Sequence, residues 1–263
     1  MDVLNALILG VVQGITEFLP VSSSGHLSLA QLILGLNVDE ATVQTFDMLI
    51  RLATALGIVV YFLNDFGKLF TKNRRELMWL LIASVPVFLM EAFFSGNIDA
   101  AKTKILVIGI GFVGTAIFLV GGEVFAIKKD DDEPVKFFDA LLIGLAQAVS
   151  LLPGVSRSGA TIGSGLICGI SRTKAVKFAF MLGVPAILGS VAYKLVNFTP
   201  DMVSMSFTAI LVGTFSAFGL TFLAIPVTLW LVRKGKLYWF AGYCFLVGLG
   251  AIFYALYRSG FFK

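Results

Sequence analysis

Long apolar runs separated by short polar segments dominate the chain. Six runs are long enough to cross a bilayer, because a spanning helix needs about 20 apolar residues. These runs carry few charged residues. Their bounds are Thr45–Leu63, Leu77–Phe94, Ile105–Ile127, Phe178–Val196, Phe207–Val232 and Leu237–Tyr257. The pattern predicts an all-α polytopic membrane protein with six transmembrane helices.

Two further apolar regions, residues 3–36 and 137–170, are broken near the middle. The breaks read Pro-Val-Ser-Ser-Ser-Gly from Pro20 and Pro-Gly-Val-Ser-Arg-Ser-Gly from Pro153. Proline clashes with the preceding helical turn, and serine and glycine favour loops. Unpaired backbone at membrane depth needs cover from protein or water. Each region is therefore interpreted as a re-entrant hairpin of two short helices that enter and leave on the same side.

The two halves of the chain resemble each other. The pattern G-x-x-Q-x7-V-S-x-S-G, which begins at Gly10, recurs from Gly144 at an offset of 134 residues. A second block, which begins at Phe46, matches one that begins at Phe178 at an offset of 132 residues. Two blocks in the same order indicate an internal duplication.

The duplication predicts two inverted repeats, residues 1–133 and 134–263, each with one re-entrant hairpin and three transmembrane helices. An odd number of spans inverts the second half relative to the first. Loop charges agree, since 13 of the 20 Lys and Arg residues lie in four connecting segments at 64–76, 128–136, 171–177 and 233–236. Basic loops stay in the cytoplasm. Both termini are therefore expected outside, and the hairpin tips are expected to meet near mid-membrane.

Composition agrees with this class and excludes others. Hydrophobic residues make up 58% of the chain and charged residues only 14%, whereas soluble domains carry about 25% charged residues. The formal net charge of +4 is modest and no basic run alternates with aromatic residues, so nucleic acid is not an expected partner. Cys168 and Cys244 lack the spacing of a metal site and are expected to pack as apolar side chains.

Ionisable residues beside the two breaks are the candidates for chemistry, because such groups are costly inside a membrane. Glu17 and His26 flank the first break, and Arg157 lies in the second. If the tips meet, the guanidinium, the serine hydroxyls and the starts of two short helices all suit a phosphate. The expected phosphate-binding residues are Ser22, Ser24, Gly25, Ser156, Arg157, Ser158, Gly159 and Thr161.

The expected catalytic residues are Glu17, Ser23, His26 and Arg157. His26 can act as nucleophile or as general acid or base near neutral pH, and Ser23 is the other candidate nucleophile. Glu17 can assist either one, or hold a divalent cation together with Gln13, which lies one helical turn earlier on the same face. The structural alternatives are that the serines only permit close packing, that His26 is structural, and that Arg157 only neutralises Glu17.

The segments from Gly10 to His26 and from Pro153 to Thr161 resemble the two signature motifs of the undecaprenyl-diphosphate phosphatase family, the bacitracin-resistance type. The resemblance covers the whole chain. It implies hydrolysis of undecaprenyl diphosphate on the outer face of the cytoplasmic membrane, which recycles the lipid carrier for cell-wall glycans, with a divalent metal, magnesium or calcium. It also implies roles for Gln13, Glu17, Ser23, His26, Ser156, Arg157 and Thr161.

Two positions depart from the family's pattern. Gln13 stands where some members have a glutamate, which leaves more of any metal binding to Glu17. Arg51 stands where relatives more often have an uncharged polar residue. An ion pair with Asp47, one turn earlier, is the favoured interpretation of Arg51, and an extra phosphate contact is the alternative.

The alternative function is a secondary transporter or flippase for an anion or a polyprenyl phosphate, because carriers also build sites from paired broken helices. A carrier needs anion ligands but has no need of a histidine beside a glutamate. A purely structural membrane protein leaves Glu17, His26 and Arg157 without a role. The sequence leaves open the nucleophile, which is His26, Ser23 or water, and whether two copies form a homodimer.

Overall fold

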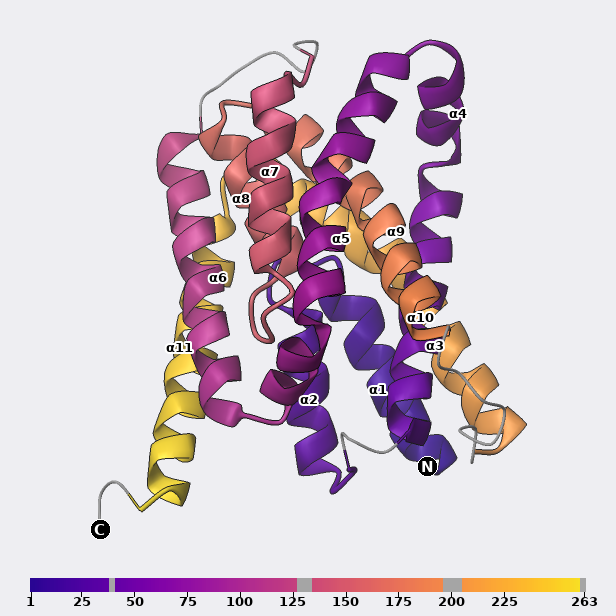
Figure 1. Cartoon of the computed structure of the whole chain (residues 1–263), viewed down its shortest axis with the longest axis vertical. Helices are drawn as coiled ribbons and strands as arrows, with labels where there is room; N and C mark the ends of the chain where they lie inside the picture. Colours follow the sequence, from indigo (N-terminus) through magenta and orange to yellow (C-terminus); the bar gives the residue numbers. More distant parts are fainter. Residues whose placement is uncertain (38–40, 127–133, 196–204, 261–263) are drawn as a thin grey trace.

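The computed structural model describes residues 1–37, 41–126, 134–195 and 205–260, and the described chain is built from helices (Figure 1). Six described helices are long and apolar enough to span a membrane, namely α3, α5, α6, α9, α10 and α11. The prediction of six transmembrane helices is therefore confirmed. In chain order the helices are α1 (Val3–Thr16), α2 (Ser23–Ile33), α3 (Ala41–Tyr61), α4 (Leu63–Thr71), α5 (Arg74–Lys102), α6 (Ile105–Phe125), α7 (Phe137–Val149), α8 (Arg157–Ile167), α9 (Arg172–Leu195), α10 (Phe207–Arg233) and α11 (Leu237–Arg258).

Both broken regions form helical hairpins. The pair α1 and α2 has 14 and 11 residues, and the pair α7 and α8 has 13 and 11. At about 1.5 Å per residue, none of these helices spans the roughly 30 Å hydrocarbon core of a bilayer. Figure 1 shows the first hairpin in the lower half of the molecule and the second in the upper half. This placement is compatible with inverted repeats, whose boundary at residues 133 and 134 stays a prediction.

The first helix of each hairpin packs on a transmembrane helix of the other half. Helix α1 lies along α10, and α7 lies along α5. A Cβ on Gly10 would collide with the backbone of Gly213, and a Cβ on Gly144 with that of Ala83. Small residues at a crossing let two helix backbones approach closely. The two matched glycines therefore hold both hairpins inside the bundle, where they are covered by transmembrane helices.

Helix α4 differs from the prediction, which made 64–76 a loop. The residues Phe62, Phe66 and Leu69 follow a helical spacing and pack into the core, and Leu69 is buried. This one-sided apolar pattern favours a short amphipathic helix between α3 and α5. Of the predicted connecting segment 128–136, residues 128–133 lie outside the described residues.

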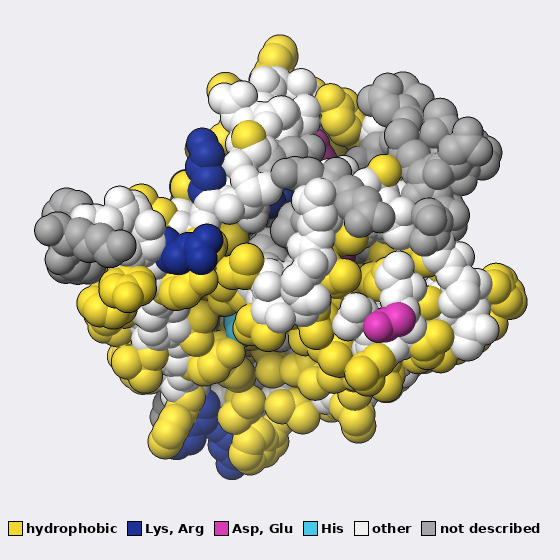
Figure 2. Space-filling view, turned by 90° about the horizontal axis from the view of Figure 1, so that it is seen from below, with side chains coloured by type: hydrophobic (Ala, Val, Ile, Leu, Met, Phe, Trp, Pro, Cys, Tyr) yellow, Lys and Arg dark blue, Asp and Glu magenta, His cyan; other side chains and the backbone are white. Residues whose placement is uncertain are grey.

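Large apolar side chains cover much of the outer surface. Figure 2 shows them around the rim of the end that carries the start of α1 and the end of α11, with few charged side chains among them. Phe93, Phe215 and Leu246, on three different transmembrane helices, are all strongly exposed. Such a surface has lipid as its natural solvent. The chain is a multi-pass membrane protein, and its two cysteines are free thiols.

Candidate active site

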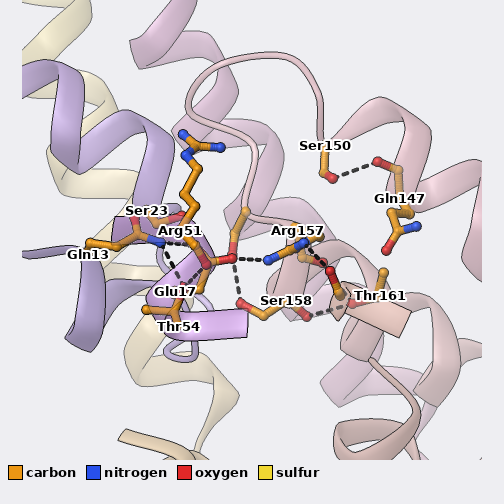
Figure 3. A network of polar contacts seen from close by, with 12 residues as sticks. Gln13, Glu17, Ser23, Arg51, Thr54, Gln147, Ser150, Arg157, Ser158 and Thr161 are labelled. Carbon is orange, nitrogen blue, oxygen red and sulfur yellow. Dashed lines mark hydrogen bonds and ion pairs between the residues drawn. The ribbon is translucent and has the colours of Figure 1, made fainter. Parts of the chain in front are cut away.

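The tips of the two hairpins meet in the middle of the bundle. The Ser158 hydroxyl, at the start of α8, donates a hydrogen bond of 3.2 Å to the carbonyl of Leu19 in the first tip. The guanidinium of Arg157 forms an ion pair with the Glu17 carboxylate, and so joins the two tips a second time. The meeting that the sequence predicted is therefore present, and Figure 3 shows the residues that take part in it.

The same serine cap begins the second helix of each hairpin. The Ser22 hydroxyl accepts from the N–H of Gly25 at 3.2 Å, and the Ser156 hydroxyl accepts from the N–H of Gly159 at 3.0 Å. A side-chain cap of this kind satisfies one of the free N–H groups at a helix start. The serine two residues further on approaches the capping hydroxyl in both hairpins. The caps aim two positive helix ends at the meeting point of the tips.

Glu17 is the centre of the polar network (Figure 3). Its Oε2 accepts a hydrogen bond of 2.6 Å from the Ser23 hydroxyl and one of 2.9 Å from Nε2 of Gln13. Its Oε1 faces Arg157. Gln13 also donates to the Thr54 hydroxyl of α3 at 3.3 Å. A buried carboxylate needs such partners, because an unpaired charge in an apolar interior is very costly.

Arg157 is the first residue of α8 and reaches across the tips. One terminal nitrogen pairs with Glu17, and the other donates to the carbonyl of Gly183 in α9 at 2.9 Å. The predicted structural alternative, neutralisation of Glu17, is thus present in this structure. It does not exclude a role in binding, because a phosphate is also a good partner for the planar fork of arginine.

A cavity of about 160 Å³ lies beside this network. It is enclosed by both hairpin tips and by α3, α5 and α9. Six of the predicted site residues line it, namely Glu17, Ser23, Ser24, Ser156, Arg157 and Ser158. Its further polar side chains include Asp47, Arg51, Glu91 and Lys102. The cavity is therefore a charged chamber inside a membrane protein, with the Glu17–Arg157 pair in its wall.

The remaining predicted residues support the cavity wall. Gln13 is fully buried next to Glu17. Ser22, Gly25 and Gly159 belong to the two helix caps. The Thr161 hydroxyl donates to the carbonyl of Arg157 at 2.7 Å, one turn back along α8.

His26 does not face the cavity, contrary to the expectation. Its Nδ1 lies 2.7 Å from the carbonyl of Ser22, and its Nε2 lies 2.7 Å from the hydroxyl of Tyr243 in α11. Because a carbonyl only accepts, Nδ1 carries a proton, and a neutral ring then accepts from Tyr243. The ring also stacks on Tyr243 and meets the edge of Phe112. These contacts place the ring against α6 and α11, and His26 is not among the residues that line the cavity.

Sequence reasoning missed several members of the site. Thr54 and the carbonyl of Gly183 hold Gln13 and Arg157 in place, and Tyr243 orients His26. The favoured ion pair between Asp47 and Arg51 is not formed; the Asp47 carboxylate accepts instead from Gln31 at 2.8 Å. The only available signal was helical spacing, which places Arg51 and Thr54 on one face of α3.

The oxygen atoms of Gln13 and Glu17 could hold a divalent cation only if a bound phosphate supplies further oxygens. No group of three His, Cys, Asp or Glu side chains occurs within the described ranges. However, Oε1 of Gln13 is buried without a hydrogen-bond partner beside the Glu17 carboxylate. Magnesium is commonly held by one or two protein oxygens plus substrate phosphates. Gln13 and Glu17 therefore fit a divalent cation that arrives with a phosphate ligand.

The fold and the cavity together define a class, the multi-pass membrane proteins that hold a charged site between two re-entrant hairpins. The chain belongs to the family described as bacitracin resistance protein BacA, whose model matches residues 6–250. It is 37% identical to an undecaprenyl-diphosphatase of Christiangramia forsetii, over 97% of this chain and 99% of that one. It is also 37% identical to an undecaprenyl-diphosphatase of Carboxydothermus hydrogenoformans, over 95% of this chain and 96% of that one. It is 34% identical to an undecaprenyl-diphosphatase of Korarchaeum cryptofilum, over 96% of this chain and 99% of that one.

Proposed function

We propose that the protein hydrolyses undecaprenyl diphosphate, or a related polyprenyl diphosphate, to the monophosphate and inorganic phosphate. This reaction recycles the lipid carrier of cell-wall glycan synthesis and confers bacitracin resistance. The observation that carries the proposal is the hydroxyl of Ser23, 2.6 Å from a Glu17 carboxylate whose other oxygen faces Arg157. A nucleophile, a base and a phosphate-binding cation thus share one cavity wall.

In the proposed first step, Ser23 Oγ attacks the terminal phosphorus and Glu17 accepts the hydroxyl proton. The bond between that phosphorus and the bridging oxygen breaks, and the bridging oxygen leaves with the lipid monophosphate. Arg157 and the capped starts of α2 and α8 stabilise the negative charge that develops on the phosphoryl oxygens. A phosphate that draws Arg157 toward itself also frees the Glu17 carboxylate to accept a proton.

In the proposed second step, water hydrolyses the phosphoserine. Glu17 first gives its proton to the departing monophosphate or to solvent, and then accepts one from the attacking water. As the bond from Ser23 Oγ to phosphorus breaks, the oxygen recovers a proton and inorganic phosphate leaves. His26 takes no part in either step, because its ring contacts Tyr243 and Phe112 outside the cavity.

A divalent cation, magnesium or calcium, is part of the proposal. Glu17 and the unpartnered Oε1 of Gln13 would hold it. When bound, it would neutralise charge on the two phosphates. With a single carboxylate at this position, the substrate itself supplies the remaining oxygens.

The isoprenoid chain needs an apolar path, and a groove between α5 and α7 supports one. The groove is lined by apolar side chains alone, from Ile82 to Phe94 on α5 and from Leu141 to Ala148 on α7. Ser150, two residues after Ala148, lines the charged cavity. Helix α5 contributes to both spaces, with Val87 and Glu91 to the cavity and with Ile82 and Phe93 to the groove. The diphosphate is thus proposed to sit in the cavity with its tail in this groove.

The proposed orientation places both termini and the cavity mouth toward the outer face of the cytoplasmic membrane. The excess of Lys and Arg in the loops at the other end supports it. A homodimer stays a prediction, which the mass of the purified protein in detergent tests.

The deciding experiment measures phosphate release by the purified protein from undecaprenyl diphosphate, with magnesium, with calcium and with a chelator. We expect release that the chelator abolishes, and Ser23 phosphorylation in protein quenched with acid during turnover. Release without any phosphoserine trapped during turnover would replace Ser23 by water as nucleophile. No release with any metal, combined with lipid transfer across vesicles, would establish the carrier instead.

A further inference from the structure

Arg51 has no role in the reaction described above. It lies in the middle of α3, is half-buried, and lines the cavity together with Glu17, Ser23 and Arg157. Its guanidinium has no hydrogen bond or ion pair with any residue that the structure describes. Figure 3 shows the side chain beside Gln13 and Ser23, with its guanidinium extending away from the Glu17–Arg157 pair.

An unpaired arginine in a transmembrane helix is costly, by about 3 kcal/mol or more at the helix centre. The other cations of the cavity are engaged, since Arg157 pairs with Glu17 and Lys102 has a partner of its own. Arg51 is therefore the one of these three cations whose side chain has no partner among the described residues, although the carboxylates of Asp47 and Glu91 line the same cavity. Its free N–H donors can bind the oxygens of an anion that enters the cavity.

The position of Arg51 on α3 suits a ligand with two phosphates. Thr54, which accepts from Gln13 in the Glu17 network, lies three residues further along the same helix. Arg51 and Arg157 line the same cavity from two different elements, α3 and α8. A ligand that contacts both guanidiniums therefore has to extend across the cavity, which a diphosphate does better than a single phosphate.

We propose that Arg51 binds the phosphoryl group that Arg157 does not, and that this second contact makes the site selective for diphosphates over monophosphates. The inference rests on the proposed function for its substrate. A guanidinium binds phosphate oxygens through two parallel N–H bonds. Once the diphosphate is cleaved, no single product spans both arginines, and each product is held by fewer contacts than the substrate was.

The test measures binding as well as turnover, using inorganic pyrophosphate and inorganic phosphate as probes. Their dissociation constants are taken from the protection that each gives the purified protein against thermal unfolding. For Arg51→Gln we expect pyrophosphate affinity to fall about tenfold or more, the usual effect of losing a charge-assisted contact, while phosphate affinity changes by less than about threefold. The pyrophosphate affinity of Arg51→Lys should lie between those of the wild type and Arg51→Gln, because lysine keeps the positive charge but cannot form two parallel N–H bonds to a phosphate.

Lys104→Gln is the matched control. It removes one positive charge at an exposed position next to α6 that does not line the cavity, and both affinities should stay unchanged. Equal losses of phosphate and pyrophosphate affinity in Arg51→Gln, or no loss, would overturn the inference, as would a wild-type protein that does not bind pyrophosphate.

Kinetics separate this inference from the proposed function. With lipid diphosphate, Arg51→Gln should raise KM about tenfold and change kcat less, since the lost contact is made in the bound ground state. If the wild type releases no phosphate and yet binds pyrophosphate in an Arg51-dependent way, the hydrolase proposal fails and the Arg51 site stands. If the wild type hydrolyses the lipid diphosphate and Arg51→Gln behaves like the wild type, the hydrolase proposal stands and the proposed role of Arg51 fails.

Discussion

The two hairpins share a backbone design and differ in chemistry. Ser22 and Ser156 cap their helices through the same bond to a glycine N–H three residues later. The first hairpin then adds Glu17, whereas the position that matches it in the second, at the same offset of 134 residues, is Leu151. The two hairpins thus share a framework that directs two helix starts at the meeting point of the tips, and in the proposed reaction one carboxylate distinguishes the reactive hairpin from the anchoring one.

The matched glutamines show the same contrast. Gln13 donates to both Glu17 and Thr54. Gln147, its counterpart, is fully buried, and neither polar atom of its amide has a hydrogen-bond partner. The counterpart of Thr54, at the offset of 132 residues, is Ala186. The same side chain is thus part of a network in one hairpin and an uncompensated polar group in the other.

The hairpins also make their turns differently. Ser22 adopts a left-handed backbone conformation with φ of 71°, which is unusual for a residue other than glycine. In the second hairpin the left-handed residue is Gly154, with φ of 91°. The strained serine thus lies in the hairpin that carries Glu17 and Ser23. Strain of this kind persists where the surrounding structure holds it, often at functional sites.

The largest expected effect tests the carboxylate that separates the hairpins. Glu17→Gln keeps the shape of the side chain but removes its charge and its ability to accept a proton, so phosphate release should fall about 10³-fold. The double change Glu17→Leu with Leu151→Glu, which moves the carboxylate to the matching position of the second hairpin, should not restore it. Initial rates of phosphate release measure both, and activity of the double variant near the wild-type level would refute the division of roles.

The second prediction separates the two candidate nucleophiles of the first hairpin. Ser23→Ala should lower phosphate release about 10²-fold or more, because the attacking oxygen is lost. His26→Gln should lower it less than about tenfold, since the ring lies outside the cavity and a hydrogen-bonding amide can replace its link to Tyr243. The comparison uses kcat of both variants under identical conditions. A larger loss in His26→Gln than in Ser23→Ala contradicts the arrangement of the site.

A third pair of variants tests the matched glutamines. Gln13→Leu deprives Glu17 of a donor and should reduce kcat about tenfold, the effect of one lost hydrogen bond to a charged group. Gln147→Leu removes an unpartnered buried amide, so it should leave kcat within about twofold and stabilise the protein by about 1 kcal/mol. Phosphate release and thermal unfolding in detergent check both. Destabilisation by Gln147→Leu would show that its amide has a partner.

The smallest effect concerns the groove that borders the second hairpin. Ala148→Trp places a large ring in the groove between α5 and α7. It should raise KM about fivefold for undecaprenyl diphosphate and by less than twofold for farnesyl diphosphate, because a short tail buries less apolar area there. Leu142→Trp is the control, on the same helix but outside the groove. Equal effects of the two tryptophans would place the tail elsewhere.

Much of the architecture was predictable, because helix length and apolarity are local properties. The six transmembrane helices and both hairpins follow from runs and breaks that can be counted along the chain. The meeting of Glu17 and Arg157 was also predictable, since two hairpins that enter from opposite sides bring their tips together. Contacts between side chains of helices that are distant in the sequence were not predictable. The orientation of His26 depends on Tyr243, 217 residues away, and no periodicity reveals such a partner.

The sequence by itself determined that this protein spans a membrane, that it contains two broken and matched hairpins, and that Glu17, His26 and Arg157 lie beside their breaks. Hydrophobic burial in lipid and the cost of unpaired backbone dictate these features for any arrangement of the helices. Only the tertiary structure decided which charges are paired. It joined Arg157 to Glu17, joined His26 to Tyr243, and left the guanidinium of Arg51 in the cavity wall without an ion pair among the described residues. Pairing depends on distances of a few ångströms between helices, and those distances are set by packing of the whole bundle.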